Sequence, residues 1–257
     1  MRTLSVQALV CLLITSALYV PALGGEQPAE QPNNSADRAI PSITTYLAAI
    51  RQKMEVKWPN NQTINIVTHG HSVPAGYFKT PVVDTFNAYP HLLHVVLKRQ
   101  YPHAVINVIN TAIGGENSVK GAKRFEQDVL SHRPDLITID YALNDRGVGL
   151  EKSLEAWEFM IKLAKKEGVP VLLLTPTWDM RSDMQDPNDP LNLHAEQIRQ
   201  LAKKHSVGLV DSHQAFLHYV SQEDNELTDI MSTVNHPNRR GHSLVASELM
   251  LWFPSTD

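Results

Sequence analysis

The sequence has a single cysteine, Cys11, among its 257 residues, so no disulfide can form within the chain. It also has no long run of Lys or Arg, and 23 basic against 27 acidic residues give a formal net charge of −4. This charge pattern argues against a protein that binds nucleic acid or an anionic membrane surface. With 42% hydrophobic and 19% charged residues, the composition is typical of a folded globular protein and not of a disordered one.

An apolar stretch near the N-terminus, Val6–Val20, is short of the roughly 20 residues that a membrane-spanning helix needs. It follows Arg2 and is followed by the small residues Ala22 and Gly24, which is the pattern of a secretory signal peptide. We therefore predict that residues 1–24 are a signal peptide and that the protein is secreted or periplasmic, with no membrane span in its mature form. Cleavage would remove Cys11, leaving neither a disulfide nor a thiol nucleophile.

Residues 25–41 are polar and rich in proline, and we predict that they form a flexible leader. We predict that residues 42–257 form one domain. In this domain apolar runs of strand length alternate with longer segments of helical period. The runs are nearly continuous in Val, Ile and Leu, as expected for a parallel sheet covered by helices on both faces. The sequence thus predicts a three-layer α/β/α sandwich with five parallel strands.

The expected strands are Thr63–Thr68, Ala104–Thr111, Asp135–Tyr141, Val169–Thr175 and Val207–Val210. The expected helices are Tyr89–Tyr101, Ser118–His132, Leu150–Lys166, Leu191–His205, Ser212–Val220 and Gly241–Phe253.

Turns of small residues, each with one polar side chain, follow the first three strands and precede the last helix. They contain Ser72, Gly115, Asn144 and His236 in turn. Ligands of such sheets bind outside the carboxyl ends of the strands, so we expect these four residues to meet at one edge of the sheet. Each of them alone also suits an ordinary turn or helix cap, and it is their convergence that favours a catalytic site.

The four residues together could carry out nucleophilic catalysis. A serine hydroxyl is a weak nucleophile unless a base lies within hydrogen-bond reach, and His236 is the best candidate for the base that activates Ser72. The backbone N–H groups of Ser72 and Gly115 and the side-chain amide of Asn144 are candidate donors to the oxyanion that forms when the serine attacks an ester carbonyl.

These motifs resemble the sequence blocks of the SGNH (GDSL-type) hydrolase family over about residues 63 to 253. The resemblance lies in Gly70-His71-Ser72, in Gly115 five residues after Asn110, in Asn144-Asp145, and in the H-P-N-x-x-G-H motif of residues 236–242. It implies a flavodoxin-like α/β/α domain and ester hydrolysis through an acyl-enzyme, with no metal and no cofactor. It also implies that Ser72 and His236 are catalytic and that Ser72, Gly115 and Asn144 form the oxyanion hole.

Two positions depart from the family's pattern. His71 stands where the family has Asp before the nucleophile, and Thr233 stands where it has Asp three residues before the catalytic histidine. Such an acid orients the imidazole and stabilises its cation. Without it, His236 could be held by a backbone carbonyl, by Thr233, or by a displaced carboxylate of Asp229 or Asp224.

Three functions remain open. The first is an esterase that removes O-acetyl groups from carbohydrate, because the expected edge loops carry aromatic and polar groups that suit a sugar: Tyr77, Phe78, Trp178, Asp179 and Arg181. The second is a lipase-like or lysophospholipase-like acylhydrolase, although the Trp178–Pro190 loop looks too polar to line an apolar groove. The third is a non-catalytic member of the family that binds glycans. The expected partner is a small-molecule or glycan ester.

A metal site is the less favoured interpretation of the 12 histidines. His69 and His71, together with His236 or His242, could bind a metal ion, since imidazole suits Zn²⁺. However, no carboxylate lies near His69 or His71 in the sequence, and no HExxH-like spacing occurs. We therefore predict no metal, and a hydrogen-bonding role for His71 near the nucleophile.

Overall fold

The structure is a computed structural model that describes residues 39–255. The predicted signal peptide and the predicted leader as far as residue 38 lie outside the described residues, and both stay predictions. Within residues 39–255, no helix combines the length and the apolar character needed to cross a membrane.

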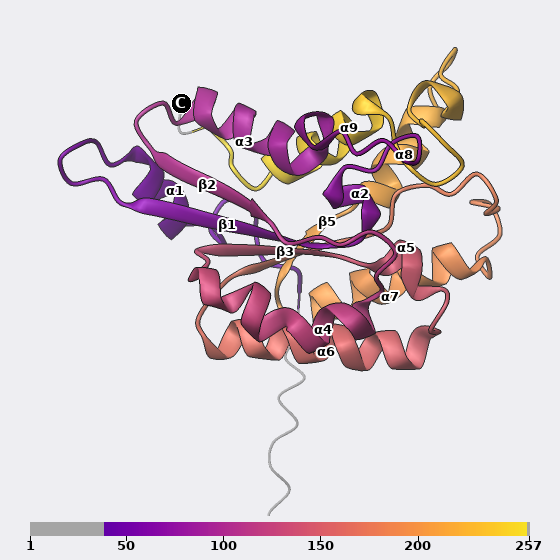
Figure 1. The fold of residues 1–257 in the computed structure, drawn as a ribbon, viewed down its shortest axis with the longest axis horizontal. Coiled ribbons are helices and arrows are strands. Elements are labelled where there is room, and N and C mark those ends of the chain that lie inside the picture. The colour runs from indigo at the N-terminus through magenta and orange to yellow at the C-terminus, as the bar shows by residue number, and fades with distance from the viewer. Residues whose placement is uncertain (1–38, 256–257) are drawn as a thin grey trace, which may run out of the picture. The chain divides into compact units, whose positions relative to one another are not determined.

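A five-stranded sheet forms the middle layer (Figure 1). The strands are β1 (Thr63–Gly70), β2 (Val105–Asn110), β3 (Leu136–Asp140), β4 (Val171–Leu174) and β5 (Gly208–Val210). All neighbouring pairs are parallel, and the order is β2-β1-β3-β4-β5, which is the flavodoxin-like order. The predicted fold class is confirmed. Because β1 and β3 pair as far as Gly70 opposite Asp140, the turns that follow these two strands begin side by side.

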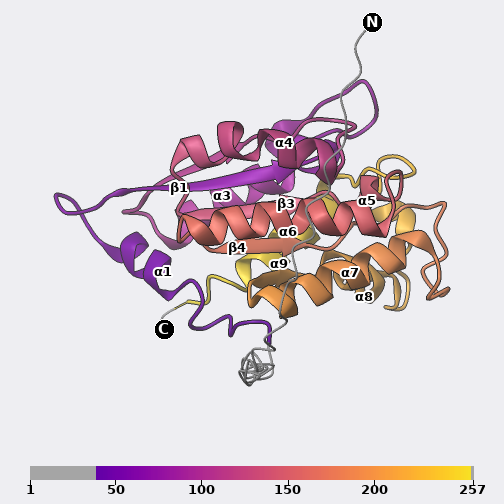
Figure 2. The same cartoon turned by 90° about the horizontal axis from the view of Figure 1, so that it is seen from below.

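Helices cover both faces of the sheet. Figure 1 shows α3 and α9 above it and α4, α6 and α7 below it, and the view from below in Figure 2 places α6 between α4 and α7. The α-helices are α1 (Ala48–Glu55), α2 (Ser72–Ala75), α3 (Tyr89–Gln100), α4 (Ser118–Asp128), α5 (Ala142–Asp145), α6 (Leu150–Lys166), α7 (Pro190–His205), α8 (Ser212–Val220) and α9 (Arg239–Met250). Short 3₁₀ turns are η1 (Thr85–Asn87), η2 (Leu130–His132) and η3 (Leu227–Asp229).

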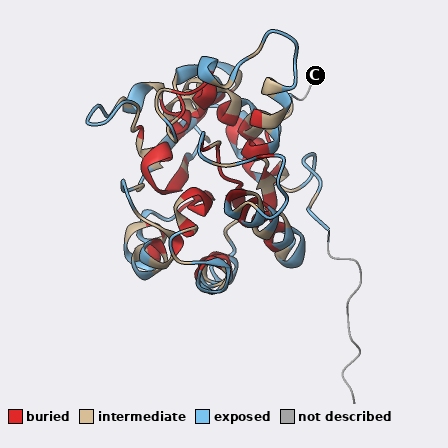
Figure 3. Cartoon of the chain, turned by 90° about the vertical axis from the view of Figure 1, so that its right-hand side faces the viewer, coloured by how far each residue is buried: buried red, intermediate tan, exposed pale blue. Residues whose placement is uncertain are grey.

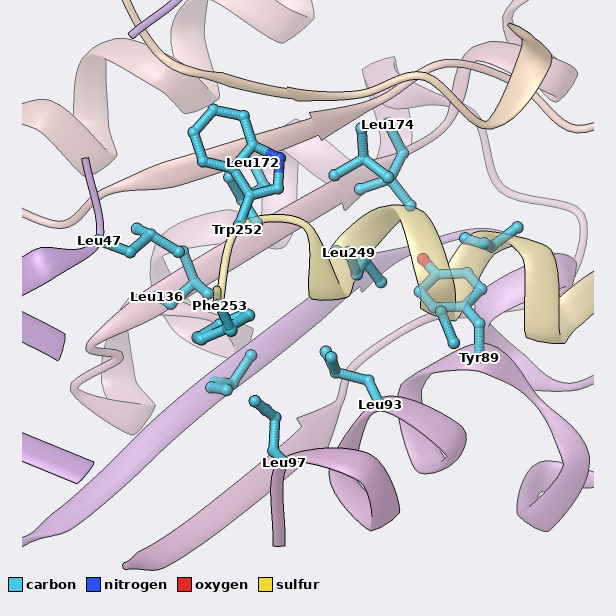
Figure 4. Packing of buried hydrophobic residues seen from close by; sticks show 14 of the residues in the cluster. Leu47, Tyr89, Leu93, Leu97, Leu136, Leu172, Leu174, Leu249, Trp252 and Phe253 are labelled. Carbon is cyan, nitrogen blue, oxygen red and sulfur yellow. The ribbon is translucent and has the colours of Figure 1, made fainter. Parts of the chain in front are cut away.

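Two apolar cores explain why the strand sequences are almost continuously hydrophobic. Along β4, Leu172 and Leu174 belong to the core beneath α3 and α9, whereas Val171 and Leu173 belong to the core above α4, α6 and α7. Side chains alternate between the two faces of a strand, so both sets are buried. Figure 4 shows the first core. In Figure 3 the helix faces that point toward the sheet are buried, and the faces that point outward are exposed.

The structure differs from the expected elements in unexpected helices and in element ends. The helices α1, α2 and α5 were not predicted, and α1 buries Ile50 and Met54 in the first core. The strand β1 runs two residues further than expected, and β3 and β4 are shorter. The expected helix 118–132 ends as an α-helix at Asp128 and continues as the 3₁₀ turn η2. No helix continues past His132, because Pro134 disfavours a helical conformation at Arg133, which is left-handed with φ of 47°. The last helix is α9, which begins and ends earlier than the expected 241–253.

The start of α9 is fixed by the asparagine of the H-P-N motif. Asn238 Oδ1 accepts hydrogen bonds from Arg240 N at 2.8 Å and Gly241 N at 3.2 Å, which satisfies two N–H groups that a helix start leaves without partners. Its Nδ2 donates to the Asp229 carbonyl at 2.8 Å. The loop that carries His236 is therefore tied to the N-terminus of α9.

Candidate active site

The turn after β1 presents Ser72 at the carboxyl edge of the sheet. Ser72 is the first residue of the short helix α2, and the preceding His71 caps that helix by accepting a hydrogen bond from Val73 N at 3.2 Å. A Cβ at Gly70 would collide with the Asp140 carbonyl, so only glycine allows β1 to approach β3 this closely. Ser72 is 8% exposed, and its hydroxyl faces the loop before α9.

His236 meets Ser72 across 164 positions of sequence. Its Nε2 lies 2.9 Å from Ser72 Oγ, and its Nδ1 lies 3.2 Å from the Phe78 carbonyl. A carbonyl can only accept, so Nδ1 carries the proton and Nε2 is free to accept the serine hydroxyl. This is the tautomer that a general base for Ser72 requires.

The group that orients His236 is thus a backbone carbonyl, one of the alternatives that the sequence left open. In the described part of the chain, no side-chain hydrogen bond joins His236 to the other candidates. The Asp229 carboxylate accepts instead from Glu226 N at 3.0 Å, Asp224 lies in an exposed turn, and the buried Thr233 hydroxyl has no hydrogen-bond partner.

The surroundings of His236 favour its neutral form. Burial lowers the pKa of His236 below the ordinary 6.5; the hydrogen bond to the Phe78 carbonyl acts in the opposite direction, and the nearby His71 adds to the lowering. This shift favours the neutral imidazole at pH 7, the form that a base must have before it accepts a proton.

The loop of Gly115 is tied to the nucleophile turn. Ile113 N donates to the Gly70 carbonyl at 3.0 Å, and Gly114 packs so closely on the Tyr77 ring that a Cβ there would lie 2.8 Å from it. Gly115 has φ of +78° with open space around its Cα, a conformation that suits glycine. Gly115 is thus an exposed turn residue, two positions after the bond that ties its loop to Gly70.

Asn144 lies in α5, directly after β3, and Asp145 anchors it. Asp145 accepts from Ser118 N at 2.8 Å and from Trp157 Nε1 at 2.7 Å, and burial raises its pKa. The Asn144 Nδ2 donates to the Glu116 carbonyl at 2.8 Å. The two side chains of this pair thus have different partners.

The histidines of the disfavoured metal site have protein partners. His69 contacts Thr111 Oγ1 at 2.9 Å, the Gly121 carbonyl at 3.2 Å and the Tyr141 hydroxyl at 3.1 Å, and burial lowers its pKa to about 3. Within residues 39–255, no group of three or more His, Cys, Asp or Glu side chains is arranged to hold a metal ion.

The expectation that Asp179 is one of the loop residues that suit a sugar is wrong. It is fully buried and bonded to Arg146 and Arg181. Burial acts to raise the pKa of Asp179, but the bonds from the two arginines outweigh it and hold the pKa at about 2. Its carboxylate therefore anchors the loop, whose next residue, Met180, donates its N–H to Val234 O at 2.8 Å. Sequence reasoning did not reveal this burial, since nothing near Asp179 marks it as a core residue.

Comparison with known proteins defines the class of this protein. The sequence matches the GDSL-like lipase/acylhydrolase family over residues 68–244, a span that includes Ser72 and His236. The chain belongs to this family and is a carboxylic ester hydrolase, as the sequence motifs predicted. It is 28% identical over 171 residues to an acetylxylan esterase from Geobacillus stearothermophilus, an alignment that covers 59% of this chain and 74% of the relative.

Solved structures agree on the fold. The acetylxylan esterase Axe2 from Geobacillus stearothermophilus superposes with a TM-score of 0.65 at 20% identity, over 74% of this chain and 93% of that one. A two-domain esterase active on acetylated mannans gives a TM-score of 0.66 at 22% identity and covers 83% of this chain. This chain spans only 55% of that two-domain protein.

Proposed function

We propose that the chain is an exported serine esterase that removes O-acetyl groups from carbohydrate through an acyl-enzyme. The observation that carries the proposal is the pair formed by Ser72 Oγ and His236 Nε2 at 2.9 Å, with the proton of His236 held on Nδ1 by the Phe78 carbonyl. The relatives named above, which act on acetylated xylan and acetylated mannan, support carbohydrate as the substrate class.

In the proposed mechanism Ser72 Oγ attacks the ester carbonyl and its proton passes to His236 Nε2. The Ser72 and Gly115 N–H groups and the Asn144 amide stabilise the oxyanion, each donor contributing about 3 kcal/mol in comparable sites. The imidazolium then donates its proton to the departing sugar oxygen. A water molecule, deprotonated by His236, attacks the acetyl-serine, and acetate leaves as the proton returns to Ser72.

The Phe78 carbonyl replaces one of the two functions of the missing acid. It orients the ring through a hydrogen bond, but it carries no full negative charge with which to stabilise the imidazolium. We therefore expect a lower turnover than an acid at this position would give, and a lower pKa for the base.

The pH dependence of the reaction follows from this environment. Because burial lowers the pKa of His236 and only the neutral ring accepts the serine proton, kcat/KM should stay high down to pH 6.5 and fall at lower pH. In Thr233→Asp a carboxylate beside the ring would stabilise the cation, so the acidic limb should move to higher pH. The measurement is the pH profile of p-nitrophenyl acetate hydrolysis, with Thr233→Asn as the uncharged control. A wild-type limb above pH 6.5 would contradict the assignment.

A lipase-like activity is the second candidate, and one observation favours it. Val82, Val83 and Phe86 are exposed at 55%, 48% and 75% in the segment that follows Phe78, and an exposed apolar surface beside an active site could hold an acyl chain. Against it, the ion pairs of Asp179 with Arg146 and Arg181 make the loop that follows β4 polar.

Acyl-chain preference separates the two candidates. For a deacetylase we expect kcat/KM for p-nitrophenyl acetate to exceed that for p-nitrophenyl octanoate by about tenfold or more, since one methylene in a pocket changes discrimination by about 1–3 kcal/mol. We also expect acetate release from acetylated xylo- or manno-oligosaccharides. A preference for octanoate would favour the lipase-like candidate. Glycan binding without hydrolysis of any ester would mark a non-catalytic protein.

A further inference from the structure

Tyr89 is the first residue of α3 and is completely buried in the first core, although it carries a hydroxyl (Figure 4). Its hydroxyl donates to Asp140 Oδ2 at 3.1 Å, and its backbone N–H donates to His242 Nδ1 at 3.2 Å. Buried polar groups are costly unless they are paired. Tyr89 thus joins two polar groups, Asp140 and His242, that come from β3 and α9.

The first set of contacts leads from Tyr89 to the nucleophile. Asp140 Oδ1 lies 3.3 Å from His71 Nε2, within ion-pair range although not aligned as a hydrogen bond. Both side chains are almost fully buried, with 1% of His71 and 4% of Asp140 exposed. Since His71 Nδ1 accepts from Val73 N, the proton of its ring is on Nε2 and faces Asp140. His71 directly precedes Ser72, so these contacts fix the turn that carries the serine.

The second set of contacts leads from Tyr89 to the imidazole. The buried His242 ring stacks on Phe78, with centroids 4.9 Å apart and planes at 26°. Phe78 is the residue whose carbonyl accepts from His236 Nδ1. The position of that carbonyl therefore depends on the stacking of Phe78 against His242.

The geometry points to Tyr89, His242 and Asp140 as positioning residues that set Ser72 and His236 relative to each other in place of the acid missing at position 233. The inference rests on the proposed function. It concerns residues that touch neither the substrate nor the reacting atoms and act through His71, Phe78 and the backbone. A small misplacement of two reacting groups lowers a rate strongly, so releasing the turn of His71 or the ring of Phe78 should lower kcat.

Two replacements of His242 separate positioning from stability. His242→Phe keeps a ring against Phe78 but leaves Tyr89 N–H without an acceptor. His242→Asn keeps an acceptor near the place of Nδ1 but loses the stacking. We expect His242→Asn to lower kcat for p-nitrophenyl acetate at least tenfold with KM within about twofold, and His242→Phe to retain more than a third of kcat even if its thermal midpoint is the lower of the two.

A restored acid provides the decisive control. If His242→Asn lowers kcat by releasing the His236 ring, then adding Thr233→Asp should recover most of the loss, because the carboxylate orients the ring directly. Equal kcat values for both His242 variants, or a loss in His242→Asn that Thr233→Asp does not reduce, would overturn the inference.

A second variant keeps the test open if His242→Asn does not fold. Tyr89→Phe removes only the hydroxyl that holds Asp140, and we expect it to slow modification of Ser72 by an organophosphonate at least threefold in protein that circular dichroism shows to be folded. An unchanged rate would overturn the inference for this set of contacts. Failure of the proposed function looks different, because the wild-type protein would then neither hydrolyse esters nor react with the phosphonate.

Discussion

Replacement of Ser72 with alanine is expected to lower kcat for p-nitrophenyl acetate by about 10⁴- to 10⁶-fold, as loss of the nucleophile does in other serine hydrolases. The reason is that the variant lacks the oxygen that would form the acyl-enzyme, while His236 and the oxyanion donors remain. His236→Ala should have a comparable effect, and the double variant should be little worse than either single one, because the two residues act as a unit.

Ser243→Ala is the matched control for this loss. Ser243 is an exposed serine on α9 whose hydroxyl bonds to the Arg239 carbonyl at 2.9 Å, so its removal should leave kcat within about twofold. The kcat values of both variants are obtained from initial rates, measured over a hundredfold range of enzyme concentration so that a slow variant is still detected. If Ser72→Ala keeps more than about one hundredth of the activity, the proposed nucleophile is wrong.

Acidification from pH 7 to pH 5 is expected to cost the folded state about 4 kcal/mol through two buried histidines. Burial is the main cause that lowers the pKa of His69 and of His242 to about 3. In the unfolded chain both titrate near 6.5, so below that pH the unfolded state binds more protons, and stability falls as the pH falls from 6.5 toward 3. Each histidine contributes about 2 kcal/mol of the loss at pH 5.

Urea unfolding at pH 7 and pH 5 measures the total loss as the difference in the free energy of unfolding. The buried His194 and His213, whose pKa values burial lowers to about 4, add to the share of His69 and His242. His242→Phe removes one of the two groups and should lower the difference by about 2 kcal/mol, with His103→Gln as the control for removing an exposed histidine. The Asp179 carboxyl, with its pKa of about 2 in the fold, loses its stabilising effect only below about pH 4, outside this window. A difference under 1 kcal/mol in the wild type would contradict the burial of these rings as neutral groups.

The fold was predictable because a parallel sheet buried on both faces leaves a strong mark in the sequence. In the segment Leu136–Asp140, Leu136 belongs to the first core and Ile137 and Ile139 to the second, and the two polar residues are buried as well. The helix α1 left a weaker mark, since it covers only the start of the sheet and precedes the first strand. Helix ends were also less predictable, because they depend on local caps such as Asn238.

The meeting of Ser72 with His236 was predictable for a different reason. Ser72 follows the carboxyl end of β1, where ligands of such sheets bind. His236 lies in the turn that precedes the last helix, and its residue types suited the same edge of the sheet. The group that orients His236 was not predictable, since any residue can supply a carbonyl and Phe78 carries no mark of this role. The burial of Asp179 was missed likewise, because it depends on Arg146 from another turn.

His242 belongs to the same H-P-N-x-x-G-H motif as His236, but the motif does not indicate which residue its ring contacts. Its ring bonds to Tyr89 N, 153 positions away, and only the packing of α3 against α9 brings the two together. A contact of this kind can be found in the structure, but the spacing of residues in the sequence does not indicate it.

Modification by a fluorophosphonate probe, followed by mass spectrometry of the intact protein and of its peptides, tests the central claim most directly. The reagent reacts with an activated serine hydroxyl and stays on it. One adduct per chain, located on Ser72, absent from Ser72→Ala and strongly slowed in His236→Ala, is the result expected here. An adduct on any other residue, or none on folded protein that hydrolyses p-nitrophenyl acetate, would contradict a Ser72 acyl-enzyme.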